Sequence, residues 1–294
     1  MKSLSDNSDD APRKIIAKCS NELLSNELVA QTTNLQIAEP KTLDEIVLPE
    51  QLLKTFNGDE FLLYDSGKDD EERFFIFGTE KNLKLIENGH IYVDGTFEIA
   101  PDLFYQIYSV HVLIDSKCYP VLYIPLPKKT QKLYERFLSV IESKIDCHPI
   151  SINCDFERAM INASQKIFPK IKVHGCFYHF NQSLWRKIQA NNLEEAYNNL
   201  DSTSLTDYRK LIKLPVVLSY IPPEDVHDIF ETYKKKLDSN DPIQVKIGSF
   251  YEYFENTYLG RLTEHKTGRG ARSKVVIIRE MAMFDVDIWS INAR

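Results

Sequence analysis

The chain has 294 residues, of which 43% are hydrophobic and 27% are charged. This composition is typical of a folded globular protein and excludes collagen-like, low-complexity and wholly disordered chains. The length allows one large domain or two of ordinary size. Lysine and arginine number 36 and aspartate and glutamate 43, so the formal net charge is −7. That balance argues against a uniformly basic nucleic-acid-binding surface.

The N-terminal residues MKSLSDNSDD are polar and acidic, so no secretory signal is visible. No apolar run approaches the roughly 18–20 residues that a membrane helix needs, and we expect no membrane partner. The five cysteines are widely spread and form no CxxC pair. Scattered cysteines in odd number are typical of an intracellular protein with reduced thiols.

Strands are expected at FLLYD and RFFIFG and then in three longer runs, which are rich in aromatic and β-branched residues. The links between these three runs are very short. Short links force antiparallel neighbours, because parallel pairing needs a long crossover. The sequence therefore predicts a three-stranded meander, with strands at 90–100, 102–114 and 118–126.

The hydrophobic period then changes to that of a helix. Leu133, Phe137 and Ile141 recur at four-residue steps, which is the stripe of a core-facing helix. The order β-β-β-α-β-α-β-α predicts an α/β fold, with one mixed sheet and helices on its faces. The later elements are a strand at 150–156, a helix at 156–167, a strand at 172–180 and a helix that begins at Phe180.

After Gln189 the pattern is mostly helical and is interrupted by prolines, which predicts an all-α unit docked on the sheet domain. The run TGRGARS then predicts a basic, glycine-containing loop. The chain divides into a tail with a short helix from about Ile15 to Val29 (1–40), an α/β core (41–190), a helical insertion (191–258) and a segment with the basic loop (259–294).

Positive charge is concentrated in two parts of the chain. Residues 128–190 hold 11 Lys/Arg and 5 Asp/Glu, and residues 258–279 hold 6 and 1. Each cluster is either an ordinary solvated face or a local polyanion-binding surface on an acidic protein. The candidate DNA-binding residues are Lys128, Lys129, Arg186, Lys187, Arg261, Arg269, Arg272 and Lys274.

The predicted strand order resembles that of the ribonuclease H-like fold. In that fold a carboxylate on the first strand and another just after the fourth lie side by side and hold two Mg²⁺ ions. The matching residues are Asp94, in IYVDGTF, and Asp155, in INCDFE. Hard cations prefer oxygen ligands, and two of them about 3.5–4 Å apart clamp the attacking and leaving oxygens of a phosphodiester. The resemblance therefore implies that both aspartates are catalytic metal ligands.

Each aspartate also has a purely structural interpretation. Asp94-Gly95 is a common turn dipeptide, and Asp155 stands where a helix N-cap belongs. Further along, Cys176 and His179 form a Cys-x-x-His pair, which is half of a zinc site. No second Cys/His pair stands at the usual spacing, so we do not expect zinc. We expect this pair to pack or hydrogen-bond near Asp155.

Two longer runs then become informative. VDGTFEIAPDLFYQIYSVHV and CDFERAMINASQKIFPKIKVHGCFYHFNQSLWRKIQ resemble the transposase domain of Mutator-like elements (MULE), and shorter matches extend over roughly residues 40–290. The resemblance implies a DDE-type transposase, which uses three carboxylates and Mg²⁺ (or Mn²⁺) to cut and join DNA. Asp94 matches the first acid, Asp155 the second, and Cys176 and His179 the family's CxxH motif.

The chain departs from the family pattern in two places. No Cys/His set for an N-terminal zinc finger of the FLYWCH type is present. In the family, the third acid normally lies in an Asn-Asn-x-x-Glu-type block shortly after a segment like FDVDIWSINAR. The sequence stops at Arg294, before such a block. Glu252, Glu255 and Glu280 do not stand in the expected context.

These departures favour a truncated or domesticated transposase relative that cannot transpose alone. The alternatives are an active enzyme with another third ligand, and a non-catalytic DNA- or protein-interaction module on the same fold. We expect weak, nonspecific DNA binding, and a homo-oligomer or a protein partner is possible. The family and its substrate imply a nuclear location, with the cytoplasm as the alternative.

Overall fold

The computed structural model describes residues 40–199, 207–267 and 274–293. The helix expected near Ile15 to Val29, together with Arg269 and Arg272, lies outside these residues. Cys118, Cys147, Cys154 and Cys176 are free thiols. Among the described helices, none combines the length and the apolar character needed to cross a bilayer.

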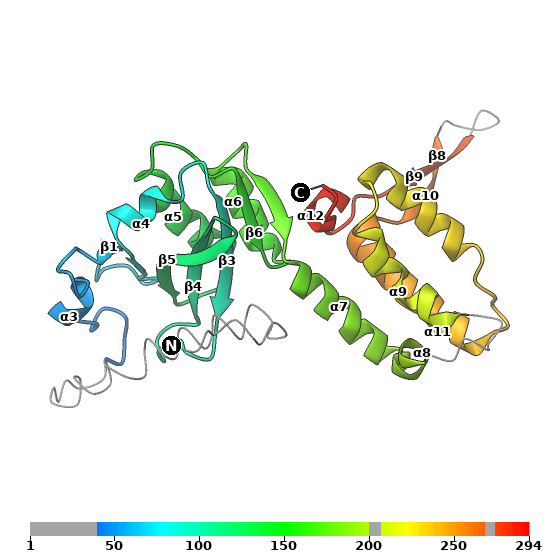
Figure 1. Ribbon diagram of the computed structural model, residues 1–294, viewed down its shortest axis with the longest axis horizontal. Helices are drawn as coiled ribbons and strands as arrows, with labels where there is room; N and C mark the ends of the chain where they lie inside the picture. The colour runs from blue at the N-terminus through cyan, green and yellow to red at the C-terminus, as the bar shows by residue number, and fades with distance from the viewer. Residues whose placement is uncertain (1–39, 200–206, 268–273, 294) are drawn as a thin grey trace.

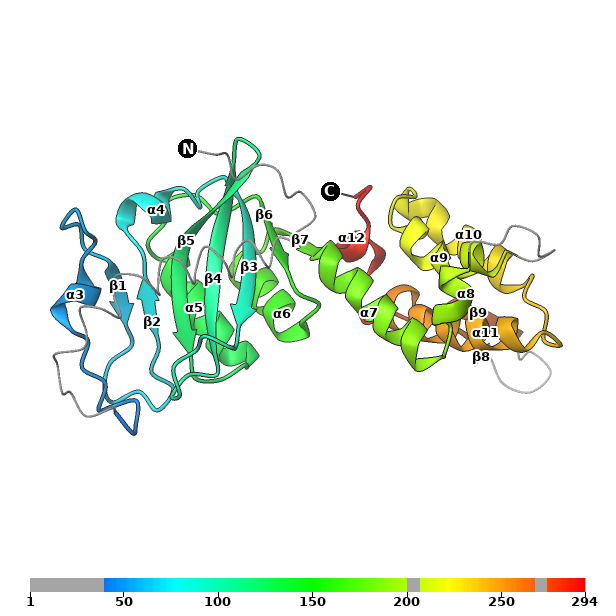
Figure 2. The ribbon, with the colours of Figure 1, turned by 60° about the horizontal axis from the view of Figure 1, so that its bottom comes forward.

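A seven-stranded mixed sheet forms the first half of the molecule (Figures 1 and 2). Its spatial order is β1-β2-β5-β4-β3-β6-β7. The pairs β3–β4 and β4–β5 are antiparallel, whereas β6 runs parallel to β3 and β7 parallel to β6. The strands are β1 (Leu62–Asp65), β2 (Phe75–Phe77), β3 (His90–Thr96), β4 (Gln106–Ile114), β5 (Lys117–Leu126), β6 (Ser151–Cys154) and β7 (Lys172–Gly175).

Five neighbouring strands of the sheet, in the spatial order β5-β4-β3-β6-β7, confirm the prediction. Strands β3, β4 and β5 form the predicted meander, and β6 and β7 are the two parallel strands. A two-residue turn at Asp115 and Ser116 joins β4 to β5, and both residues have positive φ, 49° and 63°. Positive φ at both central positions is the mark of a type I′ turn, whose twist suits a hairpin. The order β5-β4-β3-β6-β7 is that of a ribonuclease H-like core, and β1 and β2 extend it at the β5 edge.

Two helices cover the sheet where the four-residue stripe was predicted. Leu133, Phe137 and Ile141 of α5 are buried, and α5 packs against α6 beneath the strands (Figure 2). Thr130 caps α5, because its side-chain hydroxyl accepts a hydrogen bond from the Leu133 amide at 3.3 Å. The helices of this half are α3 (Glu50–Leu53), α4 (Glu80–Lys84), α5 (Gln131–Glu142) and α6 (Arg158–Ile167).

The strand expected at 172–180 is wrong in its second half. Strand β7 ends at Gly175, and α7 (Phe177–Ala190) begins two residues later. Phe180, Leu184 and Ile188 are buried on one face of α7, so the helical stripe starts earlier than the aromatic run suggests. This early start places Cys176 and His179 at the N-terminal end of α7.

Helix α7 leads from the sheet to a helical unit, which lies on the right in Figure 1. A π-helix, η1, ends this unit, and the antiparallel hairpin β8–β9 follows it. The sequence did not predict the hairpin. These elements are α8 (Glu194–Asn198), α9 (Tyr208–Leu218), α10 (Pro223–Lys234), α11 (Pro242–Phe254), η1 (Glu255–Leu259), β8 (Leu262–Thr267), β9 (Lys274–Arg279) and α12 (Val286–Trp289).

Helix α9 continues through Pro215, where we expected a proline to separate helices. A proline has no amide hydrogen, so the carbonyl four residues earlier loses its helical donor. That carbonyl belongs to Leu211, and the Tyr251 hydroxyl of α11 donates to it at 2.8 Å. A tertiary hydrogen bond thus replaces the missing helical one.

Helix α12 returns to the sheet domain and packs against β7. Its Trp289 is fully buried and stacks on Phe180 of α7, with the ring centroids 5.4 Å apart and the planes at 6°. The Trp289 indole N–H donates to the Tyr258 carbonyl at 3.0 Å. An aromatic cluster therefore joins the sheet, α7 and η1.

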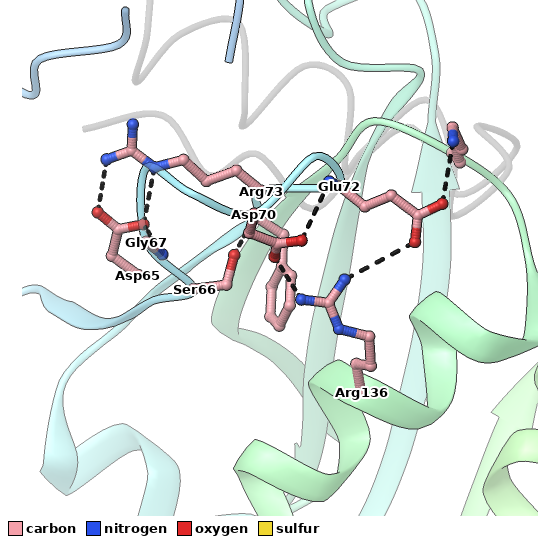
Figure 3. A network of polar contacts seen from close by, with 9 residues as sticks. Asp65, Ser66, Gly67, Asp70, Glu72, Arg73 and Arg136 are labelled. Atoms are coloured by element: carbon pink, nitrogen blue, oxygen red, sulfur yellow. Dashed lines mark hydrogen bonds and ion pairs between the residues drawn. The ribbon is translucent and has the colours of Figure 1, made fainter. Parts of the chain in front are cut away.

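A charged network fixes β1 and β2 at the other edge of the sheet (Figure 3). The buried Arg73 donates to both carboxylate oxygens of Asp65, at 2.9 and 2.6 Å, and to the carbonyls of Leu43 and Ile46. Arg136 of α5 forms an ion pair with Asp70. These contacts tie residues 43–46 and the β1–β2 connection to the body of the domain.

Candidate active site

Asp94 lies inside β3 rather than in a turn. It is opposite Ser109 of β4, whose hydroxyl donates to the Asp94 carbonyl at 3.3 Å. Its neighbours Val93 and Gly95 are buried, and Asp94 itself is half-buried. The turn interpretation of Asp94-Gly95 is therefore wrong, because the strand continues to Thr96.

Asp155 follows β6 directly. The parallel register pairs His90 with Ser151 and Tyr92 with Asn153. Continued by two residues, this register would set Asp94, which lies inside β3, opposite Asp155, which follows the end of β6. Neighbouring strands lie about 4.8 Å apart, so the backbones of the two aspartates are close. The assignment of both as catalytic metal ligands stays a prediction.

Asp155 does not cap helix α6. The N-cap residue is Glu157, and its amide donates to the Asp155 carbonyl at 2.7 Å. This tight link turns the chain after β6, so the Asp155 side chain is not used to satisfy the first turn of the helix.

The Asp155 carboxylate instead contacts the CxxH motif. His179 Nδ1 forms an ion pair with Asp155 Oδ1, and the Cys176 amide donates to the Cys154 carbonyl at 2.7 Å. Ligand atoms of Asp155, Cys176 and His179 lie within 4.8 Å of one another. The expectation that the Cys/His pair lies near Asp155 is confirmed.

The three side chains perturb one another electrostatically. Hydrogen bonds to Asp155 and then Cys176 raise the pKa of His179 to about 10, because both partners favour the imidazolium. Burial is the largest single influence on the Cys176 thiol and acts to raise its pKa. Hydrogen bonds with His179 and with the Tyr178 backbone, together with the charge of His179, outweigh burial and lower this pKa. The site therefore favours charged forms of His179 and Cys176.

One comparison with known proteins covers the segment that holds these residues. Residues 90–183, which run from the first residue of β3 into α7, match the family model of the MULE transposase domain. This part of the chain is therefore similar to the MULE transposase domain. This matched segment includes Asp94, Asp155, Cys176 and His179.

One similar solved structure is the Drosophila P element transposase strand transfer complex. It is 9% identical to this chain, with a TM-score of 0.27, and the likeness covers 60% of this chain and 67% of that one. At this score the likeness bears on neither fold nor function. No curated protein matches the chain significantly.

A third carboxylate of the matched segment, Glu157, stands two residues after Asp155 and was not assigned from the sequence. The Tyr134 hydroxyl lies 3.2 Å from each Glu157 carboxylate oxygen, and Lys129 Nζ lies 3.3 Å from Oε2. Gln106 Nε2 donates to Tyr134 at 2.9 Å. Burial, the largest influence, raises the pKa of Glu157. The only feature of the sequence that could have indicated Glu157 is its place two residues after Asp155, in CDFE.

Two glycines of the matched segment allow close packing near the acids in the sequence. A Cβ on Gly95 would lie 2.4 Å from Gln106 Oε1, and one on Gly175 would lie 2.3 Å from the Phe156 ring. Both distances are too short for a real contact. The DGTF and GCFYH segments therefore use glycine where a neighbouring side chain occupies the space.

The cationic residues proposed for DNA divide between several surfaces. Lys128 and Lys129 follow β5, and each pairs with a carboxylate, Glu72 at 3.0 Å and Glu157 at 3.3 Å. Arg186 on α7 is exposed, and Lys187 Nζ lies 5.3 Å from the centroid of the Tyr253 ring. The remaining described candidates are Arg261, which is exposed and precedes β8, and Lys274, the first residue of β9.

The carboxylates near the end of the helical unit have other surroundings. Glu255 is buried at the start of η1 and pairs with Lys234 at 2.6 Å and with Arg279 at 3.9 Å. Glu252 and Glu280 are exposed. Within the described residues, the only cluster of three potential metal ligands is Asp155, Cys176 and His179, so none of these glutamates completes a triad of acids.

Proposed function

We propose that this chain is a DDE-type transposase-derived protein that binds Mg²⁺ or Mn²⁺ through Asp94 and Asp155. The observation that supports the proposal is the β3–β6 register, because its continuation by two residues pairs Asp94 with Asp155 within the segment that matches the MULE transposase domain. A bound divalent cation would activate the attacking oxygen and stabilise the leaving oxygen of a phosphodiester.

The donor atoms of the two aspartates fit a hard cation. Carboxylate oxygens are the ligands that Mg²⁺ prefers. His179 contacts Oδ1 of Asp155, so Oδ2 is the oxygen that would remain to hold a metal together with Asp94. The oxygen, nitrogen and sulfur atoms of Asp155, His179 and Cys176 form a donor set that zinc accepts. The His179–Asp155 ion pair uses His179 Nδ1, which supports an orienting role for His179 over that of a zinc ligand.

The side chains around the aspartates would hold the carboxylates in position and balance their negative charge. His179 holds the Asp155 carboxylate in place, and Glu157 is itself held by Tyr134 and Lys129. Because a third acid does not join the two aspartates among the described residues, we expect metal binding without efficient strand transfer. We therefore propose a domesticated or otherwise incomplete transposase. Because the expected substrate is DNA, the proposed location is the nucleus.

DNA binding would rest on phosphate contacts. A net charge of −7 opposes the approach of a polyanion, so only local clusters such as Arg186 and Lys187 can hold a strand. Contacts of this kind position DNA but do not read its sequence. We therefore expect weak binding that falls steeply with salt.

A strand-transfer assay tests the proposed lack of joining. Labelled duplex ends of several unrelated sequences are incubated with supercoiled plasmid, the full chain and Mn²⁺. We expect no joined product above the level given by Asp94→Asn. Metal-dependent joining that Asp94→Asn abolishes would contradict the proposal of an incomplete site and would show that another residue acts as the third acid. DNA binding that persists in EDTA would support the interaction part of the proposal.

A further inference from the structure

An exposed aromatic pair lies in the loop that follows the strand of Asp94. Phe97 and Tyr105 begin and end the loop that joins β3 to β4, and they are 42% and 55% exposed. Their ring centroids are 5.4 Å apart, and the planes meet at 82°. Phe97 is three residues after Asp94, so the pair directly follows the carboxyl end of the strand that carries the first acid.

The loop is held in place although its aromatic rings are exposed. The Tyr105 amide donates to the Leu126 carbonyl of β5 at 2.8 Å, and the Phe104 amide donates to the Pro101 carbonyl at 2.8 Å. The Phe104 ring packs edge-on against the buried Phe75, with centroids 6.1 Å apart. The exposed pair is therefore presented on an anchored backbone.

A cation links the pair to the acidic site. Lys129 Nζ lies 5.5 Å from the Phe97 ring centroid and 3.3 Å from Glu157 Oε2. The loop residues FEIAPDLFY include Glu98 and Asp102 but no lysine or arginine. The loop itself is thus unsuited to a phosphate, whereas an uncharged, flat group can stack on its rings.

We propose that Phe97 and Tyr105 form a stacking platform for an unpaired nucleobase of a DNA strand. Lys129 contacts the phosphate of the same nucleotide when it leaves Glu157. Bases of every kind stack on exposed aromatic side chains, and nearby cations hold the backbone. The inference rests on the proposed function, because the acids beside the platform are what would place a strand there.

Fluorescence of 2-aminopurine tests the platform directly. A short single-stranded oligonucleotide with one 2-aminopurine is titrated with the full chain in EDTA, so that the result does not depend on metal binding. The matching duplex is titrated in parallel. We expect quenching by stacking with the single strand and a weaker effect with the duplex.

The informative variant is Phe97→Leu/Tyr105→Leu, which keeps apolar side chains but removes the rings. It should weaken single-strand binding at least about fivefold, the lower limit for loss of one stacked base. Phe56→Leu is the matched control, because Phe56 is 89% exposed and lies before β1. Melting temperatures of all three proteins establish that each is folded.

The outcomes separate the platform from the metal site. Loss of quenching in the double variant but not in Phe56→Leu supports the platform, even if no Mn²⁺ binding is found. Equal affinities of the wild type and the double variant overturn it, even if Mn²⁺ binds. Absence of quenching by the wild type also overturns it and favours a protein or another apolar ligand for this surface.

Discussion

His179 Nδ1 and Asp155 Oδ1 form an ion pair across the ends of two adjacent parallel strands. Asp155 follows β6, and His179 stands in the first turn of α7, which begins just after β7. The CxxH motif is thereby tied to the second acid of the site. Cys176, at the N-cap of α7, completes the contact because it hydrogen-bonds with His179.

We expect His179 to remain protonated well above neutral pH in the metal-free protein. Its pKa is raised to about 10 from an ordinary 6.5, chiefly by Asp155. The imidazolium therefore stabilises the fold fully below about pH 6.5, and this contribution is lost as the pH rises through about 10. Histidine NMR signals recorded against pH in EDTA measure the titration.

The variant Asp155→Asn should bring the His179 titration back towards neutral pH. Asp69→Asn, which changes an exposed aspartate near the β1–β2 connection, should leave it unchanged. A His179 signal that titrates near pH 6.5 in the wild type contradicts the ion pair. Cys176→Ser should be measured as well. The lowered pKa of the Cys176 thiol contributes stability that increases with pH, which is opposite to the contribution of His179.

Gly175→Ala should disturb the site through packing. The added methyl would lie 2.3 Å from the Phe156 ring, between Asp155 and Glu157 in sequence, and that ring already packs on Phe284 at 5.0 Å. Overpacking of this kind costs about 1–3 kcal/mol. Denaturant unfolding measures the loss of free energy.

Gly248→Ala is the matched glycine control. Gly248 lies inside α11, and its nearest neighbour for an added methyl is 3.9 Å away, at Leu237. Alanine favours a helix interior by up to about 1 kcal/mol over glycine, so this variant should be as stable as the wild type or more so. Equal effects of the two substitutions would mean that Phe156 moves aside without cost.

Several features were predictable because they depend on neighbours in sequence. Very short links specify the meander from β3 to β5, and alternating helices specify the parallel strands β6 and β7. The position of Asp155 beside the CxxH pair also follows from strand order. Each of these features can be predicted from the number of residues between elements and from the spacing of hydrophobic residues.

Other features depend on partners far along the chain. Helix α9 passes Pro215 because Tyr251, 36 residues later, bonds the Leu211 carbonyl. The role of Glu157 depends on Tyr134, 23 residues earlier. The aromatic run after Gly175 suggested a strand, but its burial against Trp289 fits a helix. No local pattern reveals these contacts.

The β1–β2 edge should be sensitive to acid. The Arg73 guanidinium bonds Asp65 and lowers the pKa of this carboxyl below its ordinary 3.8. A lowered carboxyl pKa stabilises the fold above about pH 4, and this contribution is lost as the pH falls through the folded-state value. Asp65→Asn should thus cost most at neutral pH and progressively less in acid, as urea unfolding at several pH values will show.

The cost of Asp65→Asn at neutral pH should be about 3 kcal/mol, the lower limit for leaving a buried charge without its partner. Arg73 retains its bonds to the Leu43 and Ile46 carbonyls, which limits the loss. Asp69→Asn again serves as the control for charge alone. A difference between wild type and Asp65→Asn that grows in acid would be inconsistent with the ion pair.

DNA binding should depend on Arg186 and Lys187 without regard to sequence. Replacing both by alanine should weaken binding of unrelated duplexes about equally and reduce the dependence of log K on log salt by about 0.9 for each phosphate that is no longer neutralised. Fluorescence anisotropy at several salt concentrations measures both quantities. Lys81→Ala, on α4 with an 84% exposed side chain, is the control. A change confined to one duplex sequence would argue for base recognition.

The most direct test of the central claim is Mn²⁺ binding measured by electron paramagnetic resonance, in which bound Mn²⁺ loses its sharp six-line signal. The wild type should bind Mn²⁺, and both Asp94→Asn and Asp155→Asn should abolish this binding, because the two carboxylates share the metal. Glu252→Gln, which alters an exposed carboxylate of α11, should bind as the wild type does. Undiminished Mn²⁺ binding by either aspartate variant would contradict a metal site shared by Asp94 and Asp155.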